Sequence, residues 1–167
     1  MARYSRIFAA LDGGATQEAV CRRTLSIAHD NNSDVLFGNV VDSSSFQNAG
    51  LGDEGLAELK KESIQKELGR YFRRSSKDEC IPSVNLEVRT GRVTETLMEM
   101  IEPFNPDLVI CGVRGLSNIK YAFVGSVSTH LIRHMNCDVL VVRPEAIEGI
   151  NYDEYPGEDE IVIDSEI

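Results

Sequence analysis

No apolar run in the sequence approaches the roughly 20 residues that a membrane-spanning helix requires. The first residues, MARYSRIFAALDGGA, include a short apolar stretch, but they lack the apolar core and small-residue cleavage site of a secretory signal peptide. A chain with neither feature is expected to function in the cytoplasm and not at a membrane.

Basic residues are missing from the last part of the chain. All 17 Lys and Arg residues lie at or before Arg143, whereas the segment from Glu145 onwards carries nine acidic groups. Residues 1–144 hold 17 basic and 18 acidic groups, so the net charge of -10 belongs almost entirely to the tail. We therefore expect one folded domain at residues 1–144, followed by a flexible acidic tail at residues 145–167.

Basic clusters interleaved with aromatic residues, which are typical of nucleic-acid-binding surfaces, are also lacking. The nearest stretch, RYFRRSSK at residues 70–77, is better explained as a cationic helix C-terminus that complements the helix dipole. No nucleic-acid partner is therefore expected. The four cysteines form neither a CxxC pair nor a zinc-binding spacing, and free thiols in a reducing compartment are expected at Cys21, Cys80, Cys111 and Cys137.

What the sequence does contain is a regular alternation of strand-like and helix-like stretches. Short apolar runs predict strands over residues 6–12, 34–42, 84–91, 105–112 and 137–144. Apolar residues at helical spacing predict helices over residues 17–31, 54–76, 93–104 and 126–135. The alternation predicts an α/β fold with a single open parallel five-stranded sheet and helices on both faces.

Two details of the helices can be tested against the structure. Thr16 precedes the first helix and is expected to cap its N-terminus. Leu59 belongs to an apolar series in the second helix and is expected on the inner side, facing the sheet. Both expectations follow from local spacing alone.

Two glycine-rich turns follow predicted strands, and in open α/β sheets ligands bind outside the carboxyl ends of the strands. Asp12-Gly13-Gly14 ends the first strand, and GVRGLSNIKYAFVGS, residues 112–126, follows the fourth. Gly112 and Gly115 would let a ligand approach the backbone without a Cβ in the way. If the two strands are neighbours, both turns border one crevice.

The end of the second turn has the character of a phosphate site. Gly125 and Ser126 would begin a helix, whose first N–H groups are unpaired donors with partial positive charge. Ser126 and Ser128 would add hydroxyl donors in the same turn. Any one of these residues could simply make a turn or cap a helix, but their order between a strand and a helix favours phosphate.

Other phosphate-binding and phosphorylation folds do not match. The Walker A pattern GxxxxGK[ST] is absent, and the first strand is not followed by the dinucleotide pattern GxGxxG. A receiver domain would need an aspartate at the end of the third strand, where this chain has Arg89-Thr90-Gly91.

The pattern G-x2-G-x9-G-[ST], formed by Gly112, Gly115, Gly125 and Ser126, resembles the ATP-binding signature of the universal stress protein family. The likeness covers about residues 3–144. The resemblance implies the family's Rossmann-like, adenine nucleotide hydrolase-like fold with strand order 3-2-1-4-5, and membership of the subgroup that binds ATP.

Further stretches are similar to the same family. ALDGG at residues 10–14 and NVVD at residues 39–42 resemble the ends of its first two strands, and residues 89–115 resemble the segment from its third strand into its fourth. The family also implies homodimers joined through the fifth strand, here Asp138 to Val142. The chain departs from the family in Gly13-Gly14, where Gly-Ser is commoner, in Val113, and in its longer acidic tail.

The resemblance implies where the nucleotide lies. Adenine would meet the backbone of Val40, with Ala10, Leu11 and Cys111 as the wall, and Asp12 would lie near the ribose or a metal ion. Because a carboxylate repels a triphosphate, ATP is expected with Mg²⁺. The complete predicted nucleotide-binding set is Ala10, Leu11, Asp12, Val40, Cys111, Gly112, Gly115, Gly125, Ser126, Val127 and Ser128.

No catalytic residue is predicted, because no side chain stands out as a group that would orient a water for hydrolysis. His130 and His134 are one helical turn apart but have no evident third ligand, so no metal site is predicted either. The sequence favours an ATP-binding regulatory protein. A slow Mg-dependent ATPase and a dimeric interaction module that binds no nucleotide remain alternatives, as do AMP or a cyclic nucleotide as the ligand.

Overall fold

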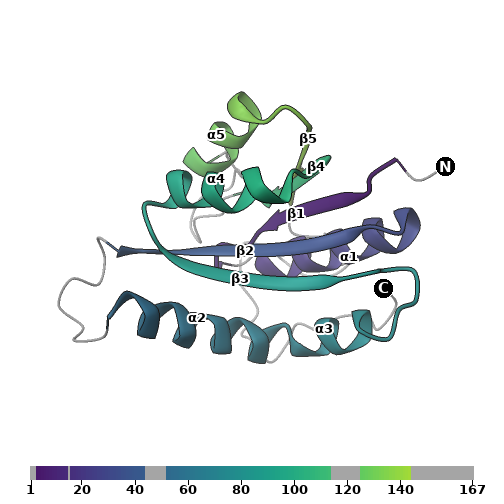
Figure 1. The fold of residues 1–167 in the computed structure, drawn as a ribbon, viewed down its shortest axis with the longest axis horizontal. Coiled ribbons are helices and arrows are strands. Elements are labelled where there is room, and N and C mark those ends of the chain that lie inside the picture. The colour runs from purple at the N-terminus through teal and green to yellow at the C-terminus, as the bar shows by residue number, and fades with distance from the viewer. Residues whose placement is uncertain (1–2, 15, 44–51, 114–124, 144–167) are drawn as a thin grey trace, which may run out of the picture.

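The computed structural model describes residues 3–14, 16–43, 52–113 and 125–143 (Figure 1). Gly115 and the acidic tail therefore lie outside the described residues. The elements are β1 (Arg6–Ala10), α1 (Gln17–Asn31), β2 (Asp34–Asp42), α2 (Asp53–Glu67), α3 (Gly69–Ser75), β3 (Val84–Gly91), α4 (Val93–Phe104), β4 (Leu108–Gly112), α5 (Ser126–His134) and β5 (Asp138–Val142).

The five strands form one parallel sheet in the order β3-β2-β1-β4-β5, which confirms the predicted fold class. β1 lies at the centre, where Ile7 pairs with Val35 of β2 on one side and with Leu108 of β4 on the other. The chain runs outward from β1 to β3 and then crosses back to β4. The strand order therefore reverses between β1 and β4.

Helices cover both faces of the sheet (Figure 1). Ile7 belongs to the core cluster shared with α1, α2 and α3, and its neighbour Phe8 to the cluster shared with α4 and α5. Successive side chains of a strand point to opposite faces, so a fully apolar strand such as β1 contributes to both cores. None of the described helices is long and apolar enough to cross a membrane.

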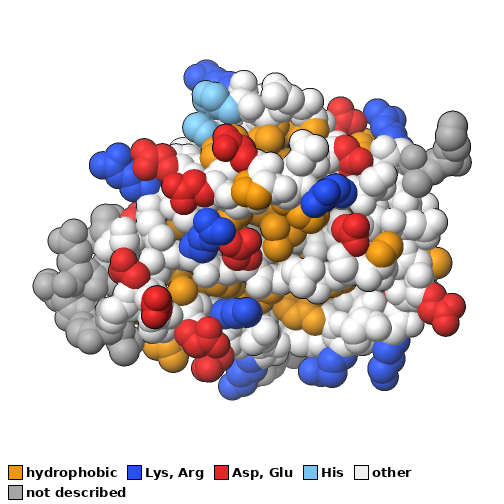
Figure 2. Space-filling view, viewed as in Figure 1, with side chains coloured by type: hydrophobic (Ala, Val, Ile, Leu, Met, Phe, Trp, Pro, Cys, Tyr) orange, Lys and Arg blue, Asp and Glu red, His pale blue; other side chains and the backbone are white. Residues whose placement is uncertain are grey.

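Charges of both signs are mixed over the face of the molecule shown in Figure 2, with no large area of a single sign. This agrees with the nearly equal numbers of basic and acidic groups in residues 1–144. The body of the protein is therefore close to neutral.

The predicted strands 34–42 and 84–91 and the helix 93–104 match β2, β3 and α4 residue for residue, whereas β1, β4 and β5 are up to three residues shorter at an end than predicted. The predicted helix 54–76 is two helices, because the backbone breaks at Leu68, with φ -100° and ψ 9°.

Of two predictions about single side chains, the one for Leu59 is wrong and the one for Thr16 is correct in position only. Leu59 is 53% exposed, because it is five residues from the buried Ile64 and so about 140° away around the helix. Thr16 occupies the N-cap position of α1 but makes no capping hydrogen bond with its side chain. Its hydroxyl donates instead to the carbonyl of Val113, 3.3 Å away, which ties α1 to the end of β4.

Candidate functional site

A cavity of about 320 Å³ lies at the carboxyl ends of β1, β2 and β4, on the face covered by α4 and α5. Ten of the eleven residues predicted to bind nucleotide line it, and the eleventh, Gly115, lies outside the described residues. The ten are Ala10, Leu11, Asp12, Val40, Cys111, Gly112, Gly125, Ser126, Val127 and Ser128. The structure thus brings together residues from three strands and a helix at the point where strand order reverses.

The floor of the cavity is fixed by hydrogen bonds that continue past the end of β1. The N–H of Leu11 donates to the carbonyl of Gly38, 2.8 Å away, and the buried Asn39 amide donates to the Leu11 carbonyl, 2.7 Å away. These two bonds hold Leu11 against β2 although it is no longer part of a regular strand. The apolar wall next to Val40 is therefore rigidly placed.

The turn after β1 is held by its own side chains. Gly13 has φ +75°, a conformation that favours glycine, and the N–H of Gly14 donates to Asp12 Oδ1, 2.8 Å away. The N–H of Gly13 donates to Gln17 Oε1 at 2.9 Å, and Gln17 Nε2 donates to Glu67 Oε2 at 3.0 Å. Asp12 therefore shapes the turn and borders the cavity at the same time.

The other border is the N-terminus of α5. Gly125 is the N-cap, with extended backbone at φ -71° and ψ 176°, and Ser126 is the first helical residue. No side-chain hydrogen bond caps this end in the described structure. Because the N-cap residue is a glycine, it has no side chain to bind the first N–H groups of α5, whose partial positive charge at the edge of the cavity favours an anion.

Ser126 and Ser128 have different surroundings, although both were expected to offer hydroxyl donors. Ser126 is exposed, whereas Ser128 is only 3% exposed and its hydroxyl donates to the carbonyl of Gly112, 3.2 Å away. The thiol of Cys111 in turn donates to the Ser128 hydroxyl at 3.5 Å. Ser128 thus ties α5 to β4, which leaves Ser126 as the available hydroxyl.

Cys111 behaves as a small buried wall residue. Its side chain is buried, and this burial raises the pKa of its thiol above the ordinary value. A thiol that stays protonated is a poor nucleophile, so Cys111 offers packing and no reactivity.

Gly112 is a glycine for a reason that the sequence did not show. A Cβ added at Gly112 would lie 2.9 Å from Thr16 Cβ and closer still to Thr16 Oγ1. The space that its missing side chain leaves is therefore filled by the first turn of α1. The backbone of Gly112 borders the cavity, but α1 packing is what excludes a side chain there.

Sequence reasoning missed three lining residues and one nearby cation. Asp42, Val93 and Leu97 also line the cavity. Asp42 ends β2 at the ligand edge, which the strand pattern could have shown, whereas Val93 and Leu97 belong to a helical stripe that looks like ordinary core. Lys60 of α2 reaches the turn after β1. Its Nζ lies so close to Gly13 that a Cβ added there would be only 2.6 Å away.

An open parallel sheet in the order 3-2-1-4-5, with a cavity at its switch point and a glycine-bounded helix N-terminus beside it, defines a Rossmann-like α/β protein with the layout of a nucleotide-binding fold. The model of the universal stress protein family matches residues 3–143, and the chain belongs to this family.

Relatives agree with this assignment. The chain is 28% identical to a putative universal stress protein of Staphylococcus haemolyticus over 148 residues, which are 88% of this chain and 89% of that protein. Universal stress protein UspA from Lactobacillus plantarum has a similar structure, with a TM-score of 0.68 and 22% identity, covering 86% of this chain and 100% of that one.

Two other solved structures with the same fold contain nucleotides. One is a universal stress protein in complex with cAMP, with a TM-score of 0.60 and 19% identity over 84% of this chain and 97% of that one. The other is an Arabidopsis thaliana universal stress family protein with AMP bound, with a TM-score of 0.53 and 15% identity over 85% of this chain and 93% of that one. These likenesses show a shared fold.

Proposed function

We propose that this protein binds ATP together with Mg²⁺ in the cavity at the ends of β1, β2 and β4, and acts as a nucleotide-dependent regulatory protein of the cytoplasm. The observation that carries the proposal is the N-terminus of α5, where Gly125 and Ser126 present uncapped helix donors to this cavity. The AMP and cAMP complexes of two proteins with the same fold support an adenine nucleotide as the ligand.

The lining of the cavity fits such a ligand. Ala10, Val40, Val93 and Leu97 give an apolar wall for a base, and α5 gives the donors for phosphate. Two carboxylates, those of Asp12 and Asp42, border the same space. Since carboxylates repel a triphosphate, Mg²⁺ between them and the phosphates makes Mg-ATP the species that fits.

Regulation follows if ATP prefers one conformation of the chain. We place this change at residues 42–53 and residues 113–124, most of which lie outside the described residues. A ligand shifts such an equilibrium only by its difference in affinity for the two conformations. A partner protein would then recognise the conformation that ATP favours.

Hydrolysis is the second candidate function of the same pocket. Among the described lining residues only Asp12 and Asp42 carry charge, so a slow ATPase would use one of these carboxylates to position water. Phosphate release above that of a variant that does not bind ATP would support this activity, and release equal to that of the variant would leave binding as the function.

Calorimetric titration of Mg-ATP, Mg-AMP and cAMP into the full chain tests the proposal. Ser126→Asp adds a carboxylate at the first position of α5, where it suits the helix dipole and preserves folding but repels phosphate. We expect saturable ATP binding that weakens at least about tenfold in this variant. Ser63→Asp, an equal charge change at an exposed position of α2, should leave the affinity unchanged.

Two outcomes would count against nucleotide binding. One is the absence of saturable heat with all three nucleotides, together with no nucleotide carried through purification. The other is an affinity that Ser126→Asp does not alter, because the phosphates would then lie away from α5. Tighter binding of AMP or cAMP than of ATP would keep the site and change its ligand.

A further inference from the structure

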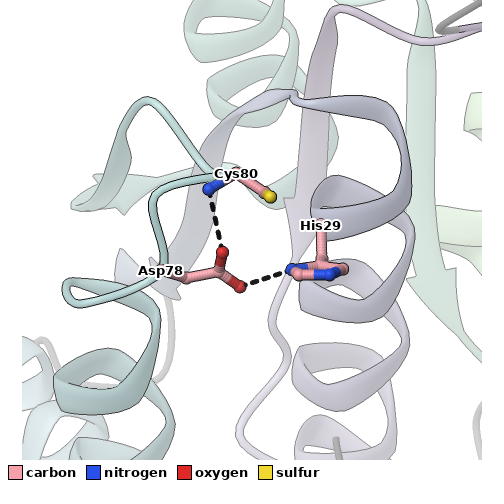
Figure 3. Close-up of side chains that lie close together, drawn as sticks. All are labelled: His29, Asp78 and Cys80. Carbon is pink, nitrogen blue, oxygen red and sulfur yellow. Dashed lines mark hydrogen bonds and ion pairs between the residues drawn. The ribbon is translucent and has the colours of Figure 1, made fainter.

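A larger depression, of about 520 Å³, lies at the opposite ends of the strands from the candidate nucleotide site. It is formed where α1 ends and where the segment between α3 and β3 begins, at the amino ends of the strands. His29 and Asp78 line it, and Cys80 stands beside Asp78 (Figure 3). These three side chains take no part in the function proposed above.

His29 meets Asp78 although the two residues are 49 positions apart in the sequence, and Cys80 lies two positions after Asp78. His29 lies in the last turn of α1, and its Nδ1 is 2.7 Å from Asp78 Oδ2. The backbone N–H of Cys80 donates to Asp78 Oδ1 at 2.9 Å. One ligand atom from each residue, a ring nitrogen, a carboxylate oxygen and the sulfur, lies within 4.8 Å of the other two.

We propose that His29, Asp78 and Cys80 bind one Zn²⁺ ion. Imidazole, carboxylate and thiolate are the three ligand types that zinc uses in proteins. A tetrahedral zinc ion holds such ligand atoms about 3.3 to 3.5 Å apart, given bonds of about 2.0 Å to nitrogen and oxygen and 2.3 Å to sulfur. The 2.7 Å between His29 Nδ1 and Asp78 Oδ2 is shorter than this range, and 4.8 Å is the upper limit for the separations of the three ligand atoms, so the side chains would rotate to complete the geometry.

The surroundings favour zinc over a harder cation. Arg74 and Lys77 line the same depression, and their positive charge repels every divalent cation, so binding there depends on ligands that hold the metal strongly. A thiolate and an imidazole bind borderline-soft metals much more strongly than they bind Mg²⁺ or Ca²⁺. With three protein ligands, the fourth position of the zinc is left to water or to Asp30, which lines the same depression.

A bound zinc ion would fasten the end of α1 to the segment that leads into β3. Because the unfolded chain does not hold these three side chains together, zinc would bind the folded protein preferentially and stabilise it. The alternative is that the His29–Asp78 contact and the Asp78–Cys80 turn only join two segments. Metal affinity and thiolate coordination separate the two cases.

The test uses the reduced, full-length protein after removal of metals with EDTA and dialysis. Zn²⁺ is titrated in competition with a chromophoric chelator, and Co²⁺ is added as a spectroscopic substitute. We expect one equivalent of Zn²⁺ and a near-ultraviolet thiolate-to-cobalt band. Cys80→Ser should abolish the band, and Cys80→Ser, Asp78→Asn and His29→Gln should each weaken Zn²⁺ binding at least about tenfold.

Cys137→Ser and His134→Asn are the matched controls. Cys137 is half-buried like Cys80, and His134 stacks on His130 with ring centroids 4.1 Å apart, so these residues are the obvious places for unspecific binding. Neither substitution should change the zinc affinity or the cobalt band. Circular dichroism of every variant shows whether its fold is retained.

Labelling of the unmodified protein adds a test that needs no variant. Zn²⁺ should slow alkylation of Cys80 by iodoacetamide, located by peptide mass mapping, without slowing that of Cys137. The proposal is overturned if wild-type protein shows no cobalt–thiolate band, if Zn²⁺ fails to protect Cys80, or if the band disappears with Cys137→Ser and survives Cys80→Ser.

Discussion

Single residues at the ligand edge of this protein serve the fold as well as the site. Gly112 borders the cavity with its backbone, while the first turn of α1 occupies the space where its side chain would lie. Ser128 borders the cavity too, but its hydroxyl is bonded to the Gly112 carbonyl. A substitution at either position therefore changes packing before it changes ligand contacts.

Gly112→Ala should destabilise the protein by about 1 to 3 kcal/mol, because the new methyl group meets Thr16 within a packed contact. Gly69→Ala is the matched control. Its Cβ would meet only the end of the flexible Arg73 side chain, 3.0 Å away, and alanine favours a helix, so this change should be neutral or stabilising by up to about 1 kcal/mol. Urea unfolding measures both free energies.

A double-mutant cycle identifies the cause of the Gly112 effect. Thr16→Ala removes the hydroxyl that the new methyl group would meet most closely, so the double variant should lose less stability than the sum of the single changes. Purely additive losses, or equal effects of Gly112→Ala and Gly69→Ala, would show that α1 does not exclude a side chain at Gly112.

At the scale of elements, one buried amide joins the turn after β1 to two helices. Gln17 accepts from the N–H of Gly13 and donates to Glu67 of α2, and it is only 1% exposed. The turn that borders the cavity is therefore fastened to both α1 and α2. The side-chain amide of Asn39 likewise fastens Leu11 to β2, because it donates to the Leu11 carbonyl.

Gln17→Leu should lower the free energy of unfolding by about 1 to 3 kcal/mol, because leucine has a similar size but leaves the Gly13 N–H and the Glu67 carboxylate without this partner. Amide exchange at Gly13 should accelerate, and ATP affinity should fall as the turn loosens. Gln65→Leu, at an exposed position of α2, should leave both quantities unchanged. Unaltered Gly13 exchange would contradict this role for Gln17.

The sequence predicted the elements well where one physical signal dominates. The apolar run of β2 and the helical stripe of α4 appear at the expected residues, because burial of a continuous strand or a single helix face leaves a clear pattern. The break at Leu68 left no such signal, since the apolar spacing continues through it into α3.

The sequence also predicted that part of the candidate site which depends on local features of the chain. Strand ends and glycine turns are local features, so the residues from Ala10 to Asp12 and from Gly125 to Ser128 could be placed at one edge of the sheet. Lys60 and the group His29, Asp78 and Cys80 depend on contacts between distant segments, which no spacing along the chain reveals.

At the scale of the whole molecule, the sheet ends at β5, and we propose that two copies join there through Asp138–Val142. Among the described strands β5 has a neighbour on one side only, and an edge strand of this kind offers backbone donors and acceptors to a second chain. Two large apolar side chains in the described structure are exposed, Leu59 of α2 at 53% and Ile132 of α5 at 52%. α5 packs beside β5, so Ile132 lies near the proposed interface and Leu59 does not.

Ile132→Lys should shift the protein from dimer toward monomer, because a charge placed beside the interface must be desolvated on association. Leu59→Lys, an equal change on the other side of the sheet, should leave the dimer intact. Sedimentation velocity at several concentrations measures the equilibrium. A wild-type protein that stays monomeric, or an equal effect of the two substitutions, would contradict an interface along β5.

The acidic tail provides the last prediction, which concerns the extent of the folded domain. The family model matches residues 3–143, and residues 1–144 alone carry almost balanced charge. A fragment of residues 1–144 should therefore fold and bind Mg-ATP with unchanged affinity. Its free energy of unfolding, measured in urea, should lie within about 0.5 kcal/mol of that of the full chain.

The fragment also separates the proposed function from the interaction module that binds no nucleotide. If the tail serves only to recruit a partner, its removal abolishes capture of that partner and leaves stability and ATP affinity untouched. A loss of more than about 2 kcal/mol in the fragment would instead mean that the tail packs on the domain, since that is more than surface changes usually cost. Retained stability with lost ATP binding would show that the tail contributes to the nucleotide site itself.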